Sequence, residues 1–203
     1  MRLNQRMTRA LALNNMEFEK DIGQCLQVLK NGGLILYPTD TVWGIGCDAT
    51  NEKAVGKIYA LKKRTDEKAM IVLVADERDV LQYTAAPDLA VFEYLQQTKK
   101  PTTVIYEGAI GLAANLVAKD GSIAIRICED PFCKQLIKRF RKPIVSTSAN
   151  ISGGTVAGSF SDILTEIKKG ADYIVRYRQD DTTLQSPSSI IKWMNGKLEV
   201  IRE

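Results

Sequence analysis

The sequence predicts an α/β (α+β) fold built on a mixed sheet. Short apolar runs alternate along the chain with segments of helical periodicity, as expected where helices pack on a sheet. Near the end, Asn195-Gly196 separates two strand-like segments and predicts a terminal β-hairpin. The chain has 203 residues, of which 45% are hydrophobic, and no linker-like stretch. We therefore expect a single domain over residues 1–203.

The first elements precede the first polar loop. Residues 1–13 form a basic segment that we expect to be frayed at the N-terminus. A helix is expected to begin at Asn14 or Asn15, either of which can cap it, and to end at Gly32. The run Leu34–Tyr37 is typical of a short buried strand. The loop that follows therefore leaves the end of a strand.

The remaining elements follow from the same periodicities. Helices are expected over residues 51–61, 76–83, 87–97, 132–140 and 161–169. Strands are expected over residues 70–74, 102–106, 122–127 and 143–146, and the two hairpin strands over 189–194 and 197–201.

Composition excludes several kinds of chemistry. The chain has no histidine, so Ser-His and Cys-His nucleophiles are excluded. Its four cysteines form no CxxC pair, and the usual zinc spacings cannot be written. We interpret these cysteines as buried, reduced thiols of a cytoplasmic protein. The reaction must then use lysine, arginine, hydroxyls, carboxylates, backbone amides or a metal.

Charge and hydropathy limit the kinds of ligand and the cellular location to be expected. The formal net charge of +4 is compatible with anionic ligands, but it is small for a dedicated nucleic-acid arm. No apolar run reaches the ~18 residues of a membrane span. The first residues also lack the apolar core of a secretory signal. A cytoplasmic protein without a membrane span is expected.

Two loops follow predicted strands and are rich in polar groups. Pro38–Gly46 contains two threonines, an aspartate and two glycines, and suits either a ligand loop or a capped turn. Its Gly44–Ala49 part matches GxGxxG/A by chance, because the strand-to-helix context of a dinucleotide site is missing. Ser146–Gly154 has the hydroxyls, amide and glycines of a phosphate- or ribose-binding loop, and we favour this over a simple linker. No GxxxxGK[ST] pattern occurs.

Basic residues supply two further candidates. Lys62, Arg64 and Lys68 lie near a predicted helix end, where they either stabilise the helix dipole or grip a polyphosphate. Arg126 shares one face of its strand with Ser122. At the end of that strand, it is either a surface residue or a bidentate clamp for a carboxylate.

In this order, the segments resemble the YrdC-like family of threonylcarbamoyl-AMP synthases. The resemblance spans about Gly32 to Arg202 and is specific as an ordered set. It rests on the Gly32–Ala49 stretch, on the KxR motif of Lys62 and Arg64, on the SxN motif of Ser148 and Asn150, on the strand that ends with Arg126, and on Pro187–Ile191.

The resemblance implies a twisted mixed sheet flanked by helices and a nucleotidyltransferase activity. Its substrates would be L-threonine, bicarbonate or CO₂, and ATP with Mg²⁺, the metal being carried by ATP. Its products would be L-threonylcarbamoyladenylate and pyrophosphate. Partner proteins would then transfer the threonylcarbamoyl group to the tRNA adenosine next to the anticodon. Oligomeric state is not implied.

The resemblance also implies roles for individual residues. Those that would hold threonine are Thr39, Thr41, Arg126 and Ser188, with Arg126 on the carboxylate. Those that would hold ATP are Lys62, Arg64, Lys68, Ser122, Ser146, Ser148, Asn150 and Arg202, and the first two are the catalytic candidates.

The chain departs from the family pattern at several positions. Thr65 and Ala69 stand where prolines are common, and Leu73 stands where some members carry a histidine. Pro101–Thr103 is a reduced form of a GPxT stretch. These departures concern substrate contacts more than the fold.

An alternative remains at this stage. The same scaffold serves non-catalytic relatives that bind double-stranded RNA or associate with ribosomes. Their basic surface would include Lys138, Arg139, Arg141 and Lys142, although such a run also suits a solvated helix end. An intact KxR with an intact SxN favours the synthase. A third possibility is an ATP-dependent carbamoyl-transfer component with another acceptor.

Overall fold

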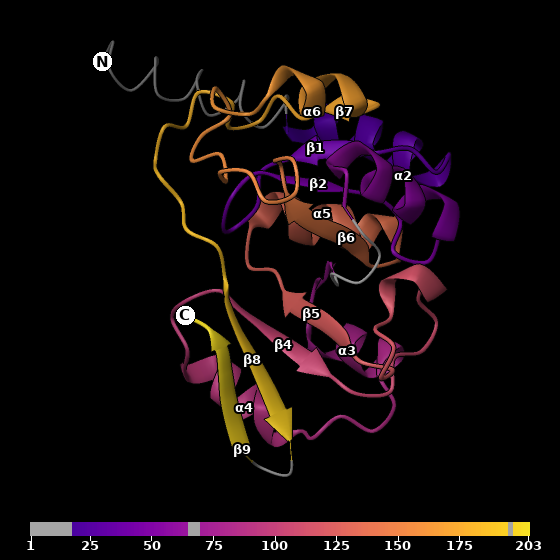
Figure 1. The fold of residues 1–203 in the computed structure, drawn as a ribbon, viewed down its shortest axis with the longest axis vertical. Helices are drawn as coiled ribbons and strands as arrows, with labels where there is room; N and C mark the ends of the chain where they lie inside the picture. The colour runs from indigo at the N-terminus through magenta and orange to yellow at the C-terminus, as the bar shows by residue number, and fades with distance from the viewer. Residues whose placement is uncertain (1–17, 65–69, 195–196) are drawn as a thin grey trace, which may run out of the picture.

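The computed structural model describes residues 18–64, 70–194 and 197–203 (Figure 1). The predicted frayed segment 1–13, the caps at Asn14 and Asn15, and the hairpin turn at 195–196 lie outside these residues. The helices are residues 18–30, α2 (Glu52–Lys62), α3 (Glu77–Tyr83), α4 (Ala90–Gln97), α5 (Pro131–Phe140) and α6 (Thr165–Gly170), with a 3₁₀ turn at Ala114–Leu116.

The strands form one mixed sheet. They are β1 (Ile35–Tyr37), β2 (Gly44–Gly46), β3 (Ile71–Val74), β4 (Thr102–Tyr106), β5 (Ile123–Ile127), β6 (Ile144–Ser148), β7 (Tyr173–Ile174), β8 (Ser189–Met194) and β9 (Lys197–Arg202). Their order across the sheet is β7-β1-β2-β6-β3-β5-β4-β8-β9. The pairs β1–β7, β3–β5 and β4–β8 are parallel, and the other neighbours are antiparallel. The predicted α/β (α+β) class and the β8–β9 hairpin pairing are confirmed.

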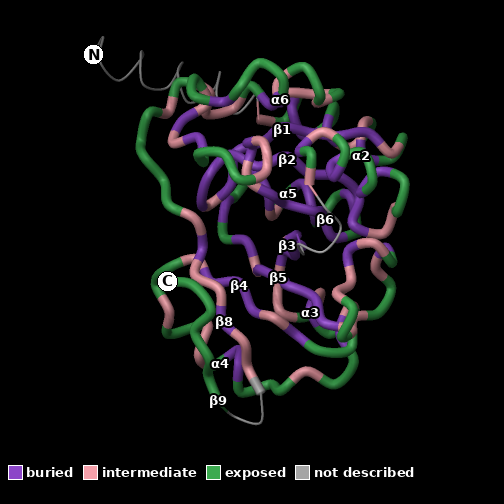
Figure 2. Tube along the Cα trace, in the orientation of Figure 1, coloured by how far each residue is buried: buried purple, intermediate pink, exposed green. Residues whose placement is uncertain are grey.

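Helices cover the two ends of the sheet. In Figure 1, α2 and α6 lie beside the end formed by β7, β1 and β2, and α4 lies against β8 at the other end. The rings of Tyr94 on α4 and Trp193 on β8 have centroids 5.8 Å apart. Burial is greatest in the central strands, whereas β9 is exposed along its length (Figure 2). All four cysteines are buried and free of disulfides, as predicted.

Local chemistry explains the helix boundaries. The side chain of Asn51 accepts from the Ala54 amide and caps α2, as its position in the sequence predicts. Asp76 and Asp79 form a reciprocal capping box at the start of α3. Asp130 accepts from the Cys133 amide, and Pro131 occupies the first turn of α5.

Five predictions differ from the structure, and one of them is the helix predicted over 87–97, which begins only at Ala90. Strand β6 reaches Ser148, two residues beyond the predicted end, because its hydroxyl-rich part pairs with β2. Helix α6 begins only at Thr165, and residues 161–163 form turns in which Ser159 is bonded to Asp162. The expected loop at 38–46 contains β2, and β7 was not predicted. Both strands are too short for a periodicity to identify.

Candidate active site

The register around β3 brings polar side chains of distant segments to one face of the sheet. Ile71 pairs with Ser146 on β6 and with Ala124 on β5. Leu73 pairs with Arg126 on β5. Side chains of paired residues project from the same face. Ser146 and Arg126 therefore face the same space, and Leu73 is the buried neighbour of Arg126.

A cavity of about 230 Å³ lies on this face. Three arginines line it, and among its described lining residues there is no aspartate or glutamate. Positive charge without a lining carboxylate favours an anionic ligand. Seven of the predicted site residues line this cavity, namely Thr41, Arg64, Arg126, Ser146, Ser148, Ser188 and Arg202.

Arg126 is held by an ion pair behind the cavity. Its Nη2 lies 3.1 Å from Oδ1 of Asp40, and their side chains are 4% and 10% exposed. The other carboxylate oxygen of Asp40 accepts from the Glu129 amide at 3.1 Å. Among the described residues, the buried Nε of Arg126 has no hydrogen-bond partner. Such an atom needs an acceptor, which a ligand in the cavity can supply.

Arg202 brings the C-terminal hairpin into the site. Its Nε and Nη2 donate to the Ser188 carbonyl at 3.2 and 2.7 Å. The hydroxyl of Ser188 lies 2.8 Å from that of Thr103 on β4. Burial and the nearby charge of Arg126 lower the pKa of Arg202. The two guanidinium groups therefore raise the positive potential of one small volume.

The threonines of the 38–46 loop have different places. Thr39 is buried, and its hydroxyl donates to the Val42 carbonyl at 2.9 Å and accepts from the Thr41 amide at 3.0 Å. The two hydroxyl oxygens are 3.0 Å apart. Since the single proton of Thr39 is used on Val42, Thr41 is the donor in this pair. Thr41 lines the cavity, and Thr39 holds Thr41 in place from behind.

The glycines of β2 permit close approach of two backbones. A Cβ at Gly46 would overlap the Val145 carbonyl oxygen and lie 2.9 Å from the Tyr37 ring. A Cβ at Gly44 would lie 2.9 Å from the hydroxyl oxygen of Ser146. These glycines therefore keep β2 close to β6 and leave room for the Ser146 hydroxyl beside the cavity.

Lys62 is buried behind the cavity wall. Its ammonium donates to the Ser148 carbonyl, to the Asn150 carbonyl at 2.6 Å and to the Asn150 side-chain oxygen at 3.3 Å. The Ser148 hydroxyl donates to the same side-chain oxygen at 2.6 Å, and the Asn150 amide donates to the Gly154 carbonyl. Burial and then the charge of Arg64 lower the pKa of Lys62 to about 8. Lys62 and Asn150 thus shape the 148–154 loop.

A left-handed residue separates Lys62 from Arg64. Lys63 has φ 51° and caps α2, and the Arg64 amide returns to the Tyr59 carbonyl at 3.0 Å. The Lys63 ammonium pairs with Glu166 on the surface at 2.9 Å. Arg64 lines the cavity, and burial lowers its pKa.

Five predicted site residues are not among those lining the cavity, namely Thr39, Lys62 and Asn150, whose supporting contacts are given above, and Ser122 and Lys68. Ser122 lies four residues before Arg126 and directly before β5, roughly 13 Å away at strand spacing, and its hydroxyl donates to Asp120 at 2.7 Å. Lys68 lies outside the described residues. The described residues that flank it, Arg64 and Met70, both line the cavity.

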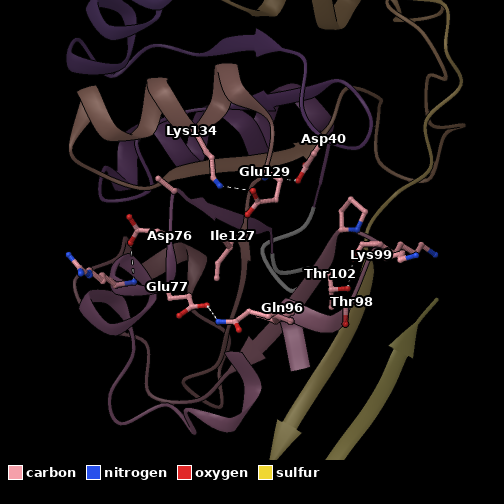
Figure 3. A pocket seen from close by; sticks show the side chains of 15 residues that line it. Asp40, Asp76, Glu77, Gln96, Thr98, Lys99, Thr102, Ile127, Glu129 and Lys134 are labelled. Atoms are coloured by element: carbon pink, nitrogen blue, oxygen red, sulfur yellow. Dashed lines mark hydrogen bonds and ion pairs between the residues drawn. The ribbon is translucent and has the colours of Figure 1, made fainter. Parts of the chain in front are cut away.

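A second cavity, of about 470 Å³, lies across the Arg126–Asp40 pair (Figure 3). Its charges are balanced, because four carboxylates and four cations line it. Figure 3 shows that Lys134 pairs with Glu129 and that Gln96 donates to Glu77. Its remaining cations, which include Lys99, are exposed. The smaller cavity is the better candidate, since its charge is one-sided and includes the buried Arg126.

Sequence reasoning missed three contributors. Asp40 was noted only as a carboxylate of its loop, and its position between two threonines gives no sign of the partner 86 residues away. Thr103 belongs only to the reduced GPxT stretch and reaches the site through β4, whereas Arg178 belongs to no motif and reaches it through a segment without regular structure. Alternation in 102–106 identifies the side of β4 that Thr103 faces, but only the sheet order shows what lies there.

Two searches of the described residues bear on cofactors and membranes. No group of three or more cysteine, aspartate or glutamate side chains in them is placed to bind a metal ion. None of their helices combines the length and the apolar character that a bilayer crossing requires.

Fold and cavity together define an α/β protein with an arginine-lined cavity whose charge favours an anionic ligand. The chain belongs to the Sua5/YciO/YrdC family, whose model, described as "Telomere recombination", matches residues 27–203. It is 30% identical over 186 residues to a protein of Pseudoalteromonas translucida (strain TAC 125) named threonylcarbamoyl-AMP synthase, covering 90% of this chain and 98% of that one.

Solved structures share the fold. Escherichia coli YciO superposes with a TM-score of 0.77 at 23% identity, covering 90% of this chain and 88% of that one. Pyrococcus abyssi Sua5 complexed with L-threonine gives 0.79 at 20% identity, covering 89% of this chain. The chain spans about half (53%) of that Sua5 chain. The predicted family is confirmed.

Proposed function

We propose that this protein is an L-threonylcarbamoyladenylate synthase that condenses L-threonine, bicarbonate or CO₂, and ATP. The observation that carries the proposal is the cavity lined by Arg64, Arg126 and Arg202 without a lining carboxylate among the described residues. A triphosphate and an amino-acid carboxylate are both anions that such a cavity favours. The name of the 30% identical relative supports the same reaction.

On the amino-acid side, we propose that Arg126 binds the threonine carboxylate. Its buried Nε has no hydrogen-bond partner among the described residues, and its Nη2 pairs with Asp40. The Thr41 hydroxyl, which donates to Thr39, keeps its oxygen available to accept from the substrate amine. Ser188 completes this side, and Thr39 acts through Thr41.

On the nucleotide side, Arg64 and Arg202 would bind phosphate oxygens, with the hydroxyls of Ser146 and Ser148 beside them. Lys62 and Asn150 would hold the loop that presents Ser148. Lys68 is retained as a phosphate ligand. Ser122 is retained as a nucleotide contact toward the other end of β5.

The reaction needs no protein nucleophile. The threonine amine attacks CO₂ and loses a proton to give a carbamate. A carbamate oxygen then bonds to the α-phosphorus of ATP while the bond to pyrophosphate breaks, giving the mixed anhydride with AMP. Arginines that neutralise the spreading phosphate charge and hold the reactants in line supply the catalysis. This chemistry suits a chain without histidine.

Three further parts of the proposal concern partners. Mg²⁺ would arrive with the ATP phosphates, whose oxygens are its preferred ligands. Transfer proteins would take the product to tRNA. We place the reaction in the cytoplasm, which suits four buried thiols without a disulfide.

The test is pyrophosphate release by the purified chain with ATP and Mg²⁺. We expect release to require both L-threonine and bicarbonate, and to fall when alanine or valine replaces threonine. If pyrophosphate release is the same with and without threonine across a Mg²⁺ series, the synthase proposal is wrong.

The alternative of a basic RNA-binding face finds less support. Arg139 is engaged with Glu19 through two hydrogen bonds, and Lys142 pairs with Asp48 at 2.7 Å. These partners neutralise half of the four-residue basic run named above. The same purified chain tested for binding to duplex RNA separates the two functions.

A further inference from the structure

The loop that carries Thr39 and Thr41 is held from outside the cavity by Arg178. Nη1 of this arginine donates to the Thr39 carbonyl at 3.2 Å and to Asp130 at 2.9 Å. Its Nε and Nη2 donate to Asp181 at 3.2 and 3.1 Å. One planar guanidinium thus joins three segments, and its donors point in the fixed directions of a rigid fork.

The surroundings fix this arginine closely. Asp130 is 4% exposed on its side chain, and its other oxygen caps α5 through the Cys133 amide at 3.0 Å. Burial raises the pKa of Asp130, while the charge of Arg178 opposes that rise. Arg178 itself has φ 63°, a left-handed conformation that a non-glycine residue keeps only where its contacts hold it.

The contact to Thr39 leads into the cavity by a short path. The hydroxyl of Thr39 orders Thr41 through its amide, and Thr41 lines the cavity. The segment that carries Arg178 runs without helix or strand from β7 to β8 along one side of the molecule (Figure 1). At its far end Ser188 also lines the cavity. Arg178 therefore bears on the amino-acid side of the site, and it does not line the cavity with Arg64.

We propose that Arg178 is a positioning residue for the amino-acid substrate, acting through Thr39 and Thr41. This inference rests on the proposed function. Without Arg178, the Thr39 carbonyl loses its donor and the 39–41 loop gains freedom. The threonine site then widens, whereas the arginines proposed for the phosphates stay in place. The effect falls on threonine and spares ATP.

The experiment compares Arg178→Ala and Arg178→Lys with Arg176→Ala. Arg176 lies in the same segment, is exposed, and has no side-chain hydrogen bond or ion pair among the described residues. We expect Arg178→Ala to raise the KM for threonine by about tenfold to about a hundredfold, with the KM for ATP within about threefold of the parent. Arg178→Lys keeps the charge but loses the fork of donors, so its KM for threonine should lie between those of the parent and Arg178→Ala. Arg176→Ala behaves as the parent.

Two outcomes overturn the proposal. One is a folded Arg178→Ala protein with an unchanged KM for threonine. The other is an equal rise in both KM values, which marks a general structural role. Should Arg178→Ala fail to fold, Asp130→Asn keeps a capping oxygen and removes the charge that faces Arg178. An unchanged KM for threonine in Asp130→Asn then counts against the proposal.

Calorimetry of threonine binding separates this inference from the proposed function. If the parent protein binds threonine but releases no pyrophosphate, the synthase proposal fails. Arg178 is then judged by the loss of threonine affinity in Arg178→Ala relative to Arg176→Ala. If the parent protein does not bind threonine, both proposals fall.

Discussion

The ammonium group of Lys62 is almost fully buried, and the acceptors that it meets among the described residues are neutral oxygens of Ser148 and Asn150. Buried charge without a counter-ion is costly, and a polar cradle offsets part of that cost. In the sequence, Lys62 and Arg64 resemble two equal members of one motif. In the structure, Arg64 lines the cavity and Lys62 supports the 148–154 loop beside it.

Lys62 predicts a specific dependence of stability on pH. Its pKa is about 8 in the folded protein and 10.5 at its ordinary value, so unfolding takes up a proton between these pH values. The unfolding free energy contributed by this group therefore rises with pH from about 8 to about 10.5. Denaturant unfolding of the parent and of Lys62→Met, measured across pH 7 to 10.5, checks this. The parent should gain stability relative to the variant as the pH rises.

The control for Lys62 is Lys53→Met, at an exposed position of the same helix. Parallel pH profiles for the parent and Lys62→Met would show that the ammonium does not titrate in this window. If the parent gained as much stability with pH relative to Lys53→Met as relative to Lys62→Met, the effect would come from the helix surface and not from Lys62.

At the scale of elements, the site depends on short strands that lie close together. Strand β2 has three residues, two of them glycine, and pairs on both sides, with β1 and with β6. Because β2 has glycines, its backbone lies close to that of β6, and room is left beside the Ser146 hydroxyl at the cavity. A segment so short has no periodicity, which is why a loop was predicted there.

Gly46→Ala tests this packing. The added methyl group meets the Val145 carbonyl and the Tyr37 ring, neither of which is the free end of a flexible side chain. We expect a loss of about 1–3 kcal/mol in the unfolding free energy. Gly56→Ala in α2 is the matched control, because nothing lies within 4 Å of its added methyl group. That control should gain up to about 1 kcal/mol from helix propensity.

Chemical denaturation of both glycine variants measures the expected loss of unfolding free energy in Gly46→Ala and the expected gain in Gly56→Ala. A neutral Gly46→Ala would mean that β2 and β6 separate without penalty. The close approach would then not be what requires glycine at this position.

For the whole molecule, charge is concentrated where the ligand is proposed to bind. The net charge is only +4, but three of the cations line one cavity of about 230 Å³. Local potential, more than net charge, governs binding of a small polyanion. The modest overall charge noted in the sequence therefore understates the field at the site.

Salt dependence of binding follows from this concentration. Raising NaCl from about 0.05 to about 0.5 M shortens the screening length from about 14 to about 4 Å. We expect the Kd for pyrophosphate, measured by calorimetry, to rise by about tenfold or more over this range. The Kd for threonine, a zwitterion, should rise less. Arg64→Gln should flatten the pyrophosphate dependence, and an unchanged slope would place Arg64 away from the phosphates.

Much of the fold could be predicted from the sequence. The long elements have clear periodicities and caps, and β4 and α2 begin and end within a residue of their expected bounds. The site was predictable as a set of motifs, because hydroxyls and basic residues follow strand ends. Its supporting contacts were not. The Asp40–Arg126 and Arg178–Thr39 contacts link residues 86 and 139 positions apart, and such pairings depend on the sheet order.

The left-handed turn at Lys63 has a consequence for how such sites are found. Basic residues that share a helix face recur every three or four positions, whereas Lys62 and Arg64 are two positions apart. Their spacing reflects a reversal of the chain at Lys63: Lys62 is buried, Lys63 pairs with Glu166 on the surface, and Arg64 lines the cavity. Inserting or deleting a single residue here would change which cation is buried, which lies on the surface and which lines the cavity, while the local number of positive charges stays almost the same. In this segment, chain length carries the functional information that composition alone does not.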